Sequence, residues 1–296
     1  MNHKSQHTGT LFIIAAGVFW ATMGIFVRAL GSYGFDSFQI SAFRLLAAGI
    51  CFVLLAAFRR ESLRIRLRDI PLFMGIGVGS IAVMTCCYFS AIRMMTMSTA
   101  AILLYTSPIW VMLMAVAFLH ERITRRKLLA LVFAFGGCAL VSGIGSGGVN
   151  ALGLIVGVVS GIAYGLYSIL GSIALRRYSP FVVTAIAFSV AALAVLAIAN
   201  PADMAAKLAA AEKLPGLLAL VLATGIVTAV IPFLLYTFGL EAVEPSRAAI
   251  LATVEPMMAT VLGIIVYREG MSLQSALGIL CILAAIVVLN LRGRKV

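Results

Sequence analysis

The sequence predicts an all-α integral membrane protein with ten transmembrane helices, arranged as two inverted five-helix repeats. The first observation is composition. Of the 296 residues, 63% are hydrophobic and only 11% are charged, and the mean hydropathy is +1.13. A water-soluble domain is roughly half apolar and about a quarter charged. The second observation is a set of ten apolar runs, and the third is a resemblance between the two halves of the chain.

Ten segments are long and apolar enough to cross a hydrocarbon core, which requires about 20 helical residues. We expect these helices at residues 10–30, 36–58, 70–92, 97–119, 127–145, 151–174, 180–199, 214–239, 246–267 and 272–291. The polar segment 203–213 is too short to span a membrane, and we expect it to form a small helix on the membrane surface.

The Lys and Arg residues predict the orientation of these helices. With the N-terminus inside, sixteen of the 22 basic residues fall in inside segments, five fall outside, and Arg44 lies within a span. Because basic loops remain in the cytoplasm, we expect a plasma (bacterial inner) membrane protein with both termini cytoplasmic. The net charge of +12 therefore needs no nucleic acid partner, since the basic residues form short clusters between apolar runs.

The chain repeats itself at a shift of 148 residues. Seven identities without a gap pair Ser98, Ala100, Ala101, Ile102, Leu103, Pro108 and Glu121 with Ser246, Ala248, Ala249, Ile250, Leu251, Pro256 and Glu269. At a shift of 144 residues, Gly17 and Trp20 meet Gly161 and Tyr164. We therefore expect two repeats, 1–148 and 149–296. Because five helices are an odd number, the second copy is expected to be inverted, which is typical of transporters.

The sequence resembles the drug/metabolite transporter superfamily of the EamA type. The resemblance is carried by the Trp20 region, by Arg44 with the apolar residues after it, and by "AAILLYTSPIW…HE" at 100–121 and "AAILATVEPMMA…RE" at 248–269. It implies a ten-helix carrier without a cofactor. Members of this superfamily carry amino acids, purines, drugs, quaternary amines and other metabolites, many of them as exporters, so the resemblance does not name a substrate.

Two prolines are expected to interrupt helices at matching places. Pro108 and Pro256 lie near the middle of the fourth and ninth spans, where proline removes a backbone hydrogen bond and clashes with the carbonyl four residues before it. Interrupted helices at corresponding positions of two repeats indicate a binding site near the midplane. The alternative is a static kink that only shapes packing.

Two charged residues are expected deep in the membrane. Glu255 is the only carboxylate within the deep part of a span, where an ionised group costs about 2.5–3.5 kcal/mol. It is a candidate to bind a substrate ammonium or to carry a coupling proton, and the alternative is a structural hydrogen bond beside Pro256. Arg44 is the only deep basic residue. It could reach toward the interface, pair with Glu255 or bind a substrate carboxylate, and we favour a structural or gating role.

Five aromatic residues with polar atoms lie in mid-span: Trp20, Tyr88, Tyr105, Tyr164 and Tyr236. Such side chains bind amphipathic or cationic ligands through apolar contact, hydrogen bonds and cation–π attraction. The alternative is tight helix packing, but the repeat pairs Trp20–Tyr164 and Tyr88–Tyr236 favour a cavity lining.

Small and acidic residues suggest two further features. Glycines spaced by four, at 153, 157, 161 and 165, allow a close approach of another helix, which we expect to be the first helix; dimerisation is the alternative. Glu121 and Glu269 end the fourth and ninth spans at opposite faces. We interpret both as anchoring residues that form hydrogen bonds during gate closure.

These features predict a secondary transporter that exports small metabolites, such as amino acids or related amines, by alternating access. The alternatives are a proton-independent exchanger or facilitator, or a carrier of a drug-like cation. A membrane-embedded enzyme or a channel is less favoured, because His occurs only at positions 3, 7 and 120 and because channels seldom use inverted repeats. We expect no metal, no catalytic residue and no cofactor, protons as a candidate partner, and a monomer or weak dimer.

Overall fold

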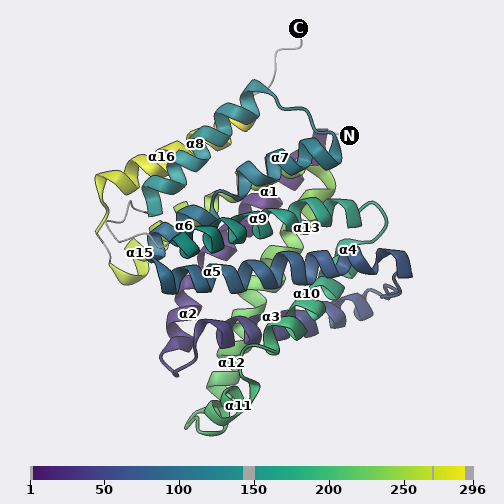
Figure 1. Cartoon of the computed structure of the whole chain (residues 1–296), viewed down its shortest axis with the longest axis vertical. Helices are drawn as coiled ribbons and strands as arrows, with labels where there is room; N and C mark the ends of the chain where they lie inside the picture. Colours follow the sequence, from purple (N-terminus) through teal and green to yellow (C-terminus); the bar gives the residue numbers. More distant parts are fainter. Residues whose placement is uncertain (1–2, 143–150, 269, 291–296) are drawn as a thin grey trace.

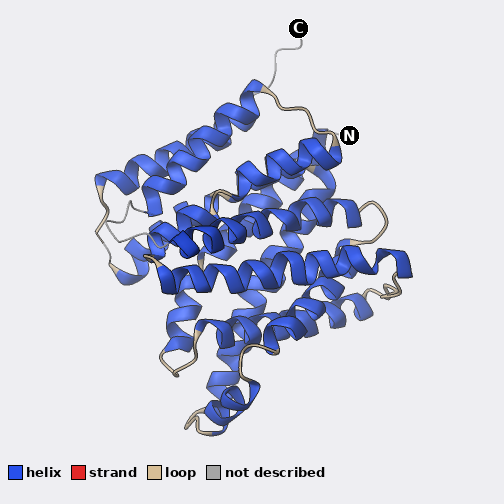
Figure 2. Ribbon diagram, viewed as in Figure 1, coloured by secondary structure: helices blue, strands red, loops and turns tan. Residues whose placement is uncertain are grey.

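The computed structural model describes residues 3–142, 151–268 and 270–290, and all regular structure in these ranges is helical (Figures 1 and 2). The first half contains α1 (His3–Ala21), α2 (Met23–Gly31), α3 (Ser37–Phe58), η1 (Leu67–Asp69), α4 (Ile70–Met74), η2 (Gly75–Ala82), α5 (Val83–Met94), α6 (Met97–Leu104), α7 (Ser107–Leu119) and α8 (Arg125–Ser142).

The second half contains α9 (Ala151–Ala174), α10 (Pro180–Leu196), α11 (Pro201–Ala209), α12 (Leu214–Gly225), η3 (Ile226–Val230), α13 (Ile231–Ala242), α14 (Pro245–Ala252), α15 (Val254–Tyr267) and α16 (Leu273–Asn290). Several of these helices join end to end within one predicted span. The predicted surface helix after residue 200 is present as α11.

Eight of the described helical segments are long and apolar enough to cross a membrane, and a ninth is reached if α10 and α11, which are bent by 88°, count as one. The prediction of ten spans therefore stays a prediction. The fifth predicted span, 127–145, coincides in large part with α8, whose first turn carries Arg125, Arg126 and Lys127. The seventh coincides with α10, which has 17 residues.

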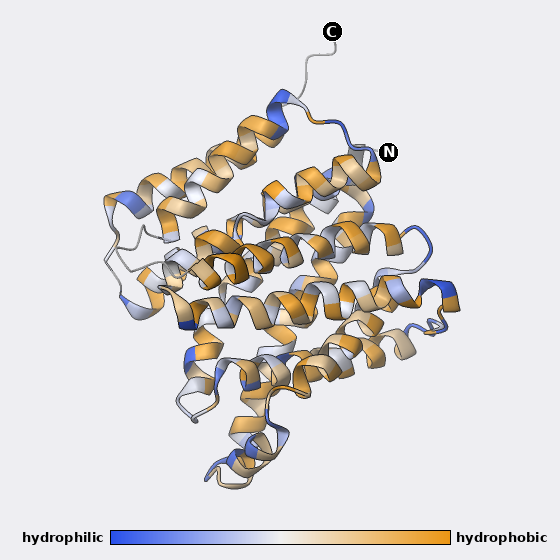
Figure 3. Cartoon of the chain, in the orientation of Figure 1, coloured by the Kyte–Doolittle hydropathy of each residue, from blue (hydrophilic) through white to orange (hydrophobic). Residues whose placement is uncertain are grey.

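The helices are apolar along most of their length (Figure 3), and many large apolar side chains are exposed as well as buried. Leu54, Leu113 and Leu280 are each more than half exposed. A water-soluble protein avoids a continuous apolar surface of this kind, whereas lipid chains solvate it. The exterior therefore fits a bilayer, in agreement with the composition.

The fourth and ninth spans are interrupted, as the prolines predict. α6 ends at Leu104 and α7 begins at Ser107, while α14 ends at Ala252 and α15 begins at Val254. A shift of 148 residues places the end of α6 on the end of α14, so the two breaks are equivalent in sequence. The third and eighth spans also correspond, because the π-helical segments η2 and η3 end at residues 82 and 230.

Glycines allow the first helix of each half to lie on the broken helix of the other half. A Cβ atom at Gly17 of α1 would overlap the Val254 side chain and lie 3.3 Å from the Glu255 nitrogen. A Cβ atom at Gly161 of α9 would lie 2.6 Å from the Leu103 carbonyl oxygen. Each first helix can therefore lie close to a break only because a side chain is missing there.

The prediction that the glycine stripe in α9 packs against the first helix was wrong. The closest neighbours of Gly157 and Gly161 belong to α6 and the following turn, and those of Gly165 belong to α7. The stripe therefore packs on the interrupted fourth span rather than on α1.

Candidate functional site

A cavity of about 330 Å³ lies inside the bundle between α1, α2, α3, α5, α6, α9 and α15. It extends from Tyr164 and Glu255, in the middle of the bundle, toward Met97, the exposed first residue of α6. The candidate site residues in its wall are Trp20, Arg44, Tyr88, Tyr105, Tyr164 and Glu255. We refer to it as the large cavity.

Glu255 brings a carboxylate into the large cavity from the first turn of α15. The hydroxyl of Tyr164 donates a hydrogen bond to Glu255 Oε2 at 3.1 Å. The free N–H groups at the start of a helix also favour a negative charge there. The break before α15 therefore positions Glu255 and supplies part of the stabilisation that a buried carboxylate needs.

Arg44 brings a guanidinium into the same cavity from the middle of α3. Its side chain is buried, its Nη1 lies 3.7 Å from the Met23 sulfur, and its Nε has no hydrogen-bond partner. The salt bridges among the described residues do not include Arg44 or Glu255. Because an unpartnered buried donor is costly, this guanidinium is poised to bind an anionic group.

Arg44 thus does not reach toward the interface, and it forms no direct ion pair with Glu255. Of the expected alternatives, the arrangement leaves two: a structural or gating role, and binding of a substrate carboxylate. The cavity thus holds one acid and one base that attract each other without a direct ion pair, so groups of either charge can be bound between them.

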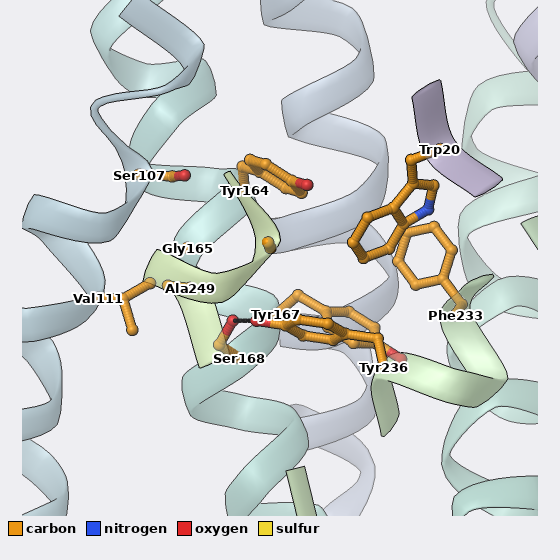
Figure 4. Close-up of a pocket in the computed structure, with 11 residues that line it drawn as sticks. Trp20, Ser107, Val111, Tyr164, Gly165, Tyr167, Ser168, Phe233, Tyr236 and Ala249 are labelled. Carbon is orange, nitrogen blue, oxygen red and sulfur yellow. Dashed lines mark hydrogen bonds between the residues drawn. The ribbon is translucent and has the colours of Figure 1, made fainter. Parts of the chain in front are cut away.

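A second, small cavity of about 20 Å³ also has Trp20, Tyr164 and Phe233 in its lining (Figure 4). These three residues line both cavities and form a partition, in which the ring centroids of Trp20 and Phe233 are 5.0 Å apart. Hydroxyl groups of Ser107, Ser168 and Tyr236 surround the small cavity, and Ser168 and Tyr236 share a hydrogen bond of 2.7 Å.

The structure thus divides the predicted aromatic residues between the two cavities. Tyr236 lines only the small cavity and is 4% exposed, whereas its repeat counterpart Tyr88 lines the large one. Pro108 and Pro256 line neither cavity, since they lie in the first turns of α7 and α15, where they set the breaks. Glu269 lies outside the described residues.

Several cavity residues were missed by the sequence analysis. Phe233 belongs to the partition, while Met23, Met84 and Thr85 line the large cavity. The repeat contains a signal for two of them, because Thr85 and Phe233 are 148 residues apart. No group of three or more His, Cys, Asp or Glu residues that could hold a metal ion occurs among the described residues.

Comparison with known proteins agrees with this arrangement. The sequence profile of the EamA-like transporter family matches residues 7–143 and again residues 151–291. The chain belongs to the EamA-like transporter family. Its relatives include an uncharacterized transporter of Archaeoglobus fulgidus, 27% identical over 96% of this chain and 97% of the relative. Another is the uncharacterized transporter YwfM of Bacillus subtilis, 26% identical over 97% of this chain and 95% of the relative.

A solved crystal structure shares the fold of this EamA-like chain. It superposes with a TM-score of 0.80 at 19% sequence identity, covering 96% of both chains. Family membership together with the apolar helices makes the chain a multi-pass membrane protein of the transporter class.

Proposed function

We propose that this chain is a secondary transporter that exports a small zwitterionic or cationic metabolite, such as an amino acid or related amine, by alternating access. The observation that carries the proposal is the large cavity, in which Glu255 and Arg44 face a volume of about 330 Å³ without pairing to each other. Trp20, Tyr88, Tyr105 and Tyr164 supply the remaining polar and aromatic wall.

The charges in the cavity support this substrate class. A carboxylate attracts an ammonium group, and an Arg guanidinium binds a carboxylate through two parallel hydrogen bonds. Aromatic rings add cation–π attraction and apolar contact. Tyr236 is not assigned to the substrate in this state, because the partition separates it from the large cavity.

Two inverted five-helix repeats, 1–148 and 149–296, complete the proposal. The family profile matches the chain twice, and the breaks before α7 and α15 fall 148 residues apart, which supports a duplicated unit. Ten spans would place both termini on the cytoplasmic side of the bacterial inner membrane. Pro108 and Pro256 then set the hinges at which the broken helices bend.

Coupling to protons is assigned to Glu255. A carboxylate in the membrane interior that accepts a hydrogen bond from Tyr164 and lies near the charge of Arg44 can exchange a proton for a substrate ammonium. The chain would act as a monomer or weak dimer, because one chain already contains the complete cavity.

The first test is ligand binding followed by flux. Amino acids, amines and drug-like cations are screened for a rise in the thermal stability of the purified protein, since a ligand that binds the folded state stabilises it. The best ligand is then used in counterflow with proteoliposomes. Saturable counterflow is expected, and a flux that rises without saturation would indicate a channel instead.

Two outcomes would replace parts of the proposal. Counterflow that is indifferent to a pH gradient would favour the proton-independent exchanger or facilitator. Accessibility labelling that places 59–69 and 203–213 on one side of the membrane would contradict the inverted repeats, which require them on opposite sides.

A further inference from the structure

The small cavity corresponds residue by residue to the large one. At the repeat shifts of 148 and 144 residues, ten of its eleven lining residues map onto residues that line the large cavity. The clearest pairs are Ser107 with Glu255, Val111 with Ala259, and Tyr236 with Tyr88. Two equivalent walls therefore enclose about 20 Å³ on one side of the partition and about 330 Å³ on the other.

An ionic cluster, buried at Glu121 and Lys127 and exposed at Glu244, lies where α7 ends and α14 begins. Lys127 Nζ lies 2.9 Å from Glu121 Oε2 and 2.6 Å from Glu244 Oε2. Ser246 donates a hydrogen bond from its hydroxyl to the same oxygen of Glu121, and its backbone nitrogen lies 3.5 Å from Glu121 Oε1. We call these four residues the latch.

The latch joins the two halves of the chain. Glu121 and Lys127 belong to the first half, whereas Glu244 and Ser246 lie at the start of α14 in the second half. Ser246 is 125 residues from Glu121 in the sequence. The side chains of Glu121 and Lys127 are only 8% and 11% exposed. Charge-assisted hydrogen bonds are strong when they are shielded from water, so this contact can hold the ends of α7 and α14 together.

The latch also lies directly outside the small cavity. Ala249, which lines that cavity, is three residues after Ser246 on α14, which is less than one helical turn. Val111 lines it from α7, the helix that leads to Glu121. Separation of α7 from α14 would therefore open the small cavity to the surface at the Glu121 end.

We propose that the small cavity is a second substrate vestibule, closed in this structure, and that the latch holds it closed. This inference rests on the proposed function. When the latch opens, Ser107, Ser168 and Tyr236 present hydroxyl groups to the substrate in place of the charges of the large cavity. A neutral hydroxyl wall binds a charged metabolite more weakly than the charged wall of the large cavity does, so the two vestibules would differ in affinity.

The test measures the accessibility of both vestibules without any substrate. In a background in which the five native cysteines are replaced by serine or alanine, a reporter is introduced as Val111→Cys in the small cavity or Ala259→Cys in the large one. A membrane-impermeant maleimide is applied to each face of oriented vesicles. With the latch intact, Val111→Cys is expected to react slowly from both faces.

Adding Ser246→Ala or Glu121→Gln is expected to raise the reaction rate of Val111→Cys at least tenfold from the Glu121 face. The same variants should lower the rate of Ala259→Cys from the opposite face, because one side opens as the other closes. Asp69→Asn is the matched control. It removes another contact of a carboxylate with the opposite half, to Arg177 at 2.9 Å and Tyr178 at 2.7 Å, that lies outside the latch, and it should change neither rate.

Two results would overturn the proposal. Unchanged rates in both latch variants would show that the latch does not close a vestibule. Faster labelling of both reporters would show that the latch only stabilises the fold. Because no substrate is present, the labelling can fail while counterflow succeeds, or the reverse, so failure of the latch and failure of the transport function are distinguishable.

Discussion

The break between α6 and α7 and the break between α14 and α15 share a backbone plan but differ in chemistry. Both occur four residues before a proline, after Leu104 and after Ala252. The helix that follows each break ends at a left-handed residue, His120 in one half and Arg268 in the other. At the first break the equivalent side chain is the hydroxyl of Ser107, and at the second it is the carboxylate of Glu255.

This difference separates the role of the backbone from that of the side chains. The interruption itself is common to both halves, so the proposed mechanism assigns it to the conformational change that the two repeats share. The carboxylate occurs once, beside the large cavity, so the proposed proton coupling is assigned to the second half, whereas the proposed binding wall draws residues from both halves. The comparison predicts that substitutions at Glu255 alter transport, whereas substitutions that affect the shared backbone alter stability.

The largest expected effect is that of Glu255→Gln. Loss of the only titratable group at the second break should reduce uptake driven by a pH gradient more than tenfold, while counterflow exchange of a saturating substrate persists. The measurement is radiolabelled uptake into proteoliposomes with and without a pH gradient.

Ser107→Ala is the matched control for Glu255→Gln, because it changes the equivalent position without touching a charge. It should leave gradient-driven uptake within about twofold. If Glu255→Gln retained full gradient-driven uptake, the assignment of the coupling proton to the second break would be wrong.

The next effect concerns the two glycines that pack on the breaks. Gly161→Ala should lower stability by about 2–3 kcal/mol, because its Cβ would lie 2.6 Å from both the Leu103 carbonyl oxygen and the Thr106 hydroxyl. Gly17→Ala should cost about 1–2 kcal/mol, since its worst overlap is with the side chain of Val254. Thermal unfolding in one detergent measures both variants.

Gly136→Ala provides the control, because a Cβ there meets nothing within 4 Å. It should stabilise α8 by about 0.5 kcal/mol, since alanine restricts the unfolded chain more than glycine does. Stabilisation by all three substitutions would mean that helix propensity, rather than contact with the breaks, determines the effect.

A smaller effect distinguishes the threonines at the breaks. Thr106 donates to the Leu103 carbonyl at 2.6 Å and accepts from Trp110 Nε1 at 3.0 Å, whereas Thr253 makes only a 2.7 Å bond to the Ile250 carbonyl. At about 1 kcal/mol for each hydrogen bond, Thr106→Val should cost about 2 kcal/mol and Thr253→Val about 1 kcal/mol. Thermal unfolding that reversed this order would show that the two breaks are held by something other than these hydroxyls.

The sequence alone predicted the membrane class, the family and the positions of both breaks, because composition and proline act locally. It also selected Glu255 and Arg44, since charges are rare in apolar spans. It did not separate Tyr88 from Tyr236, because these equivalent residues differ only in the cavity that each lines, and that depends on which side of the bundle is open. Side-chain identity cannot report a conformational state.

The sequence also could not predict which helix packs against the glycine stripe. Periodicity shows which face of α9 carries small residues, but not which helix lies against that face. The sequence did not predict the role of Phe233 for a related reason. An apolar ring in an apolar span carries no signal of its own, and its place in the partition depends on how α13 packs beside Trp20.

The smallest expected effect concerns α11, which connects α10 to α12 in the second half. The equivalent connection in the first half, between α3 and α4, is a loop with the short η1. A hydrogen bond from Lys207, and then one from Gln39, holds the pKa of Asp203 below its ordinary value. The resulting stabilisation is present above the unfolded-state pKa of about 3.9 and disappears as the pH falls through the lower folded-state value.

Asp203→Asn should therefore lower Tm at pH 7 by at most about 2 °C, because an exposed pair contributes little, and the difference from the wild type should shrink at a second pH below about 3.9. Thermal unfolding at the two pH values measures the difference. Transport should be unchanged, since Asp203 lines neither cavity. A transport defect in this variant would mean that α11, an element of the second half, also contributes to transport. The two halves would then differ in function at α11 as well as at the breaks.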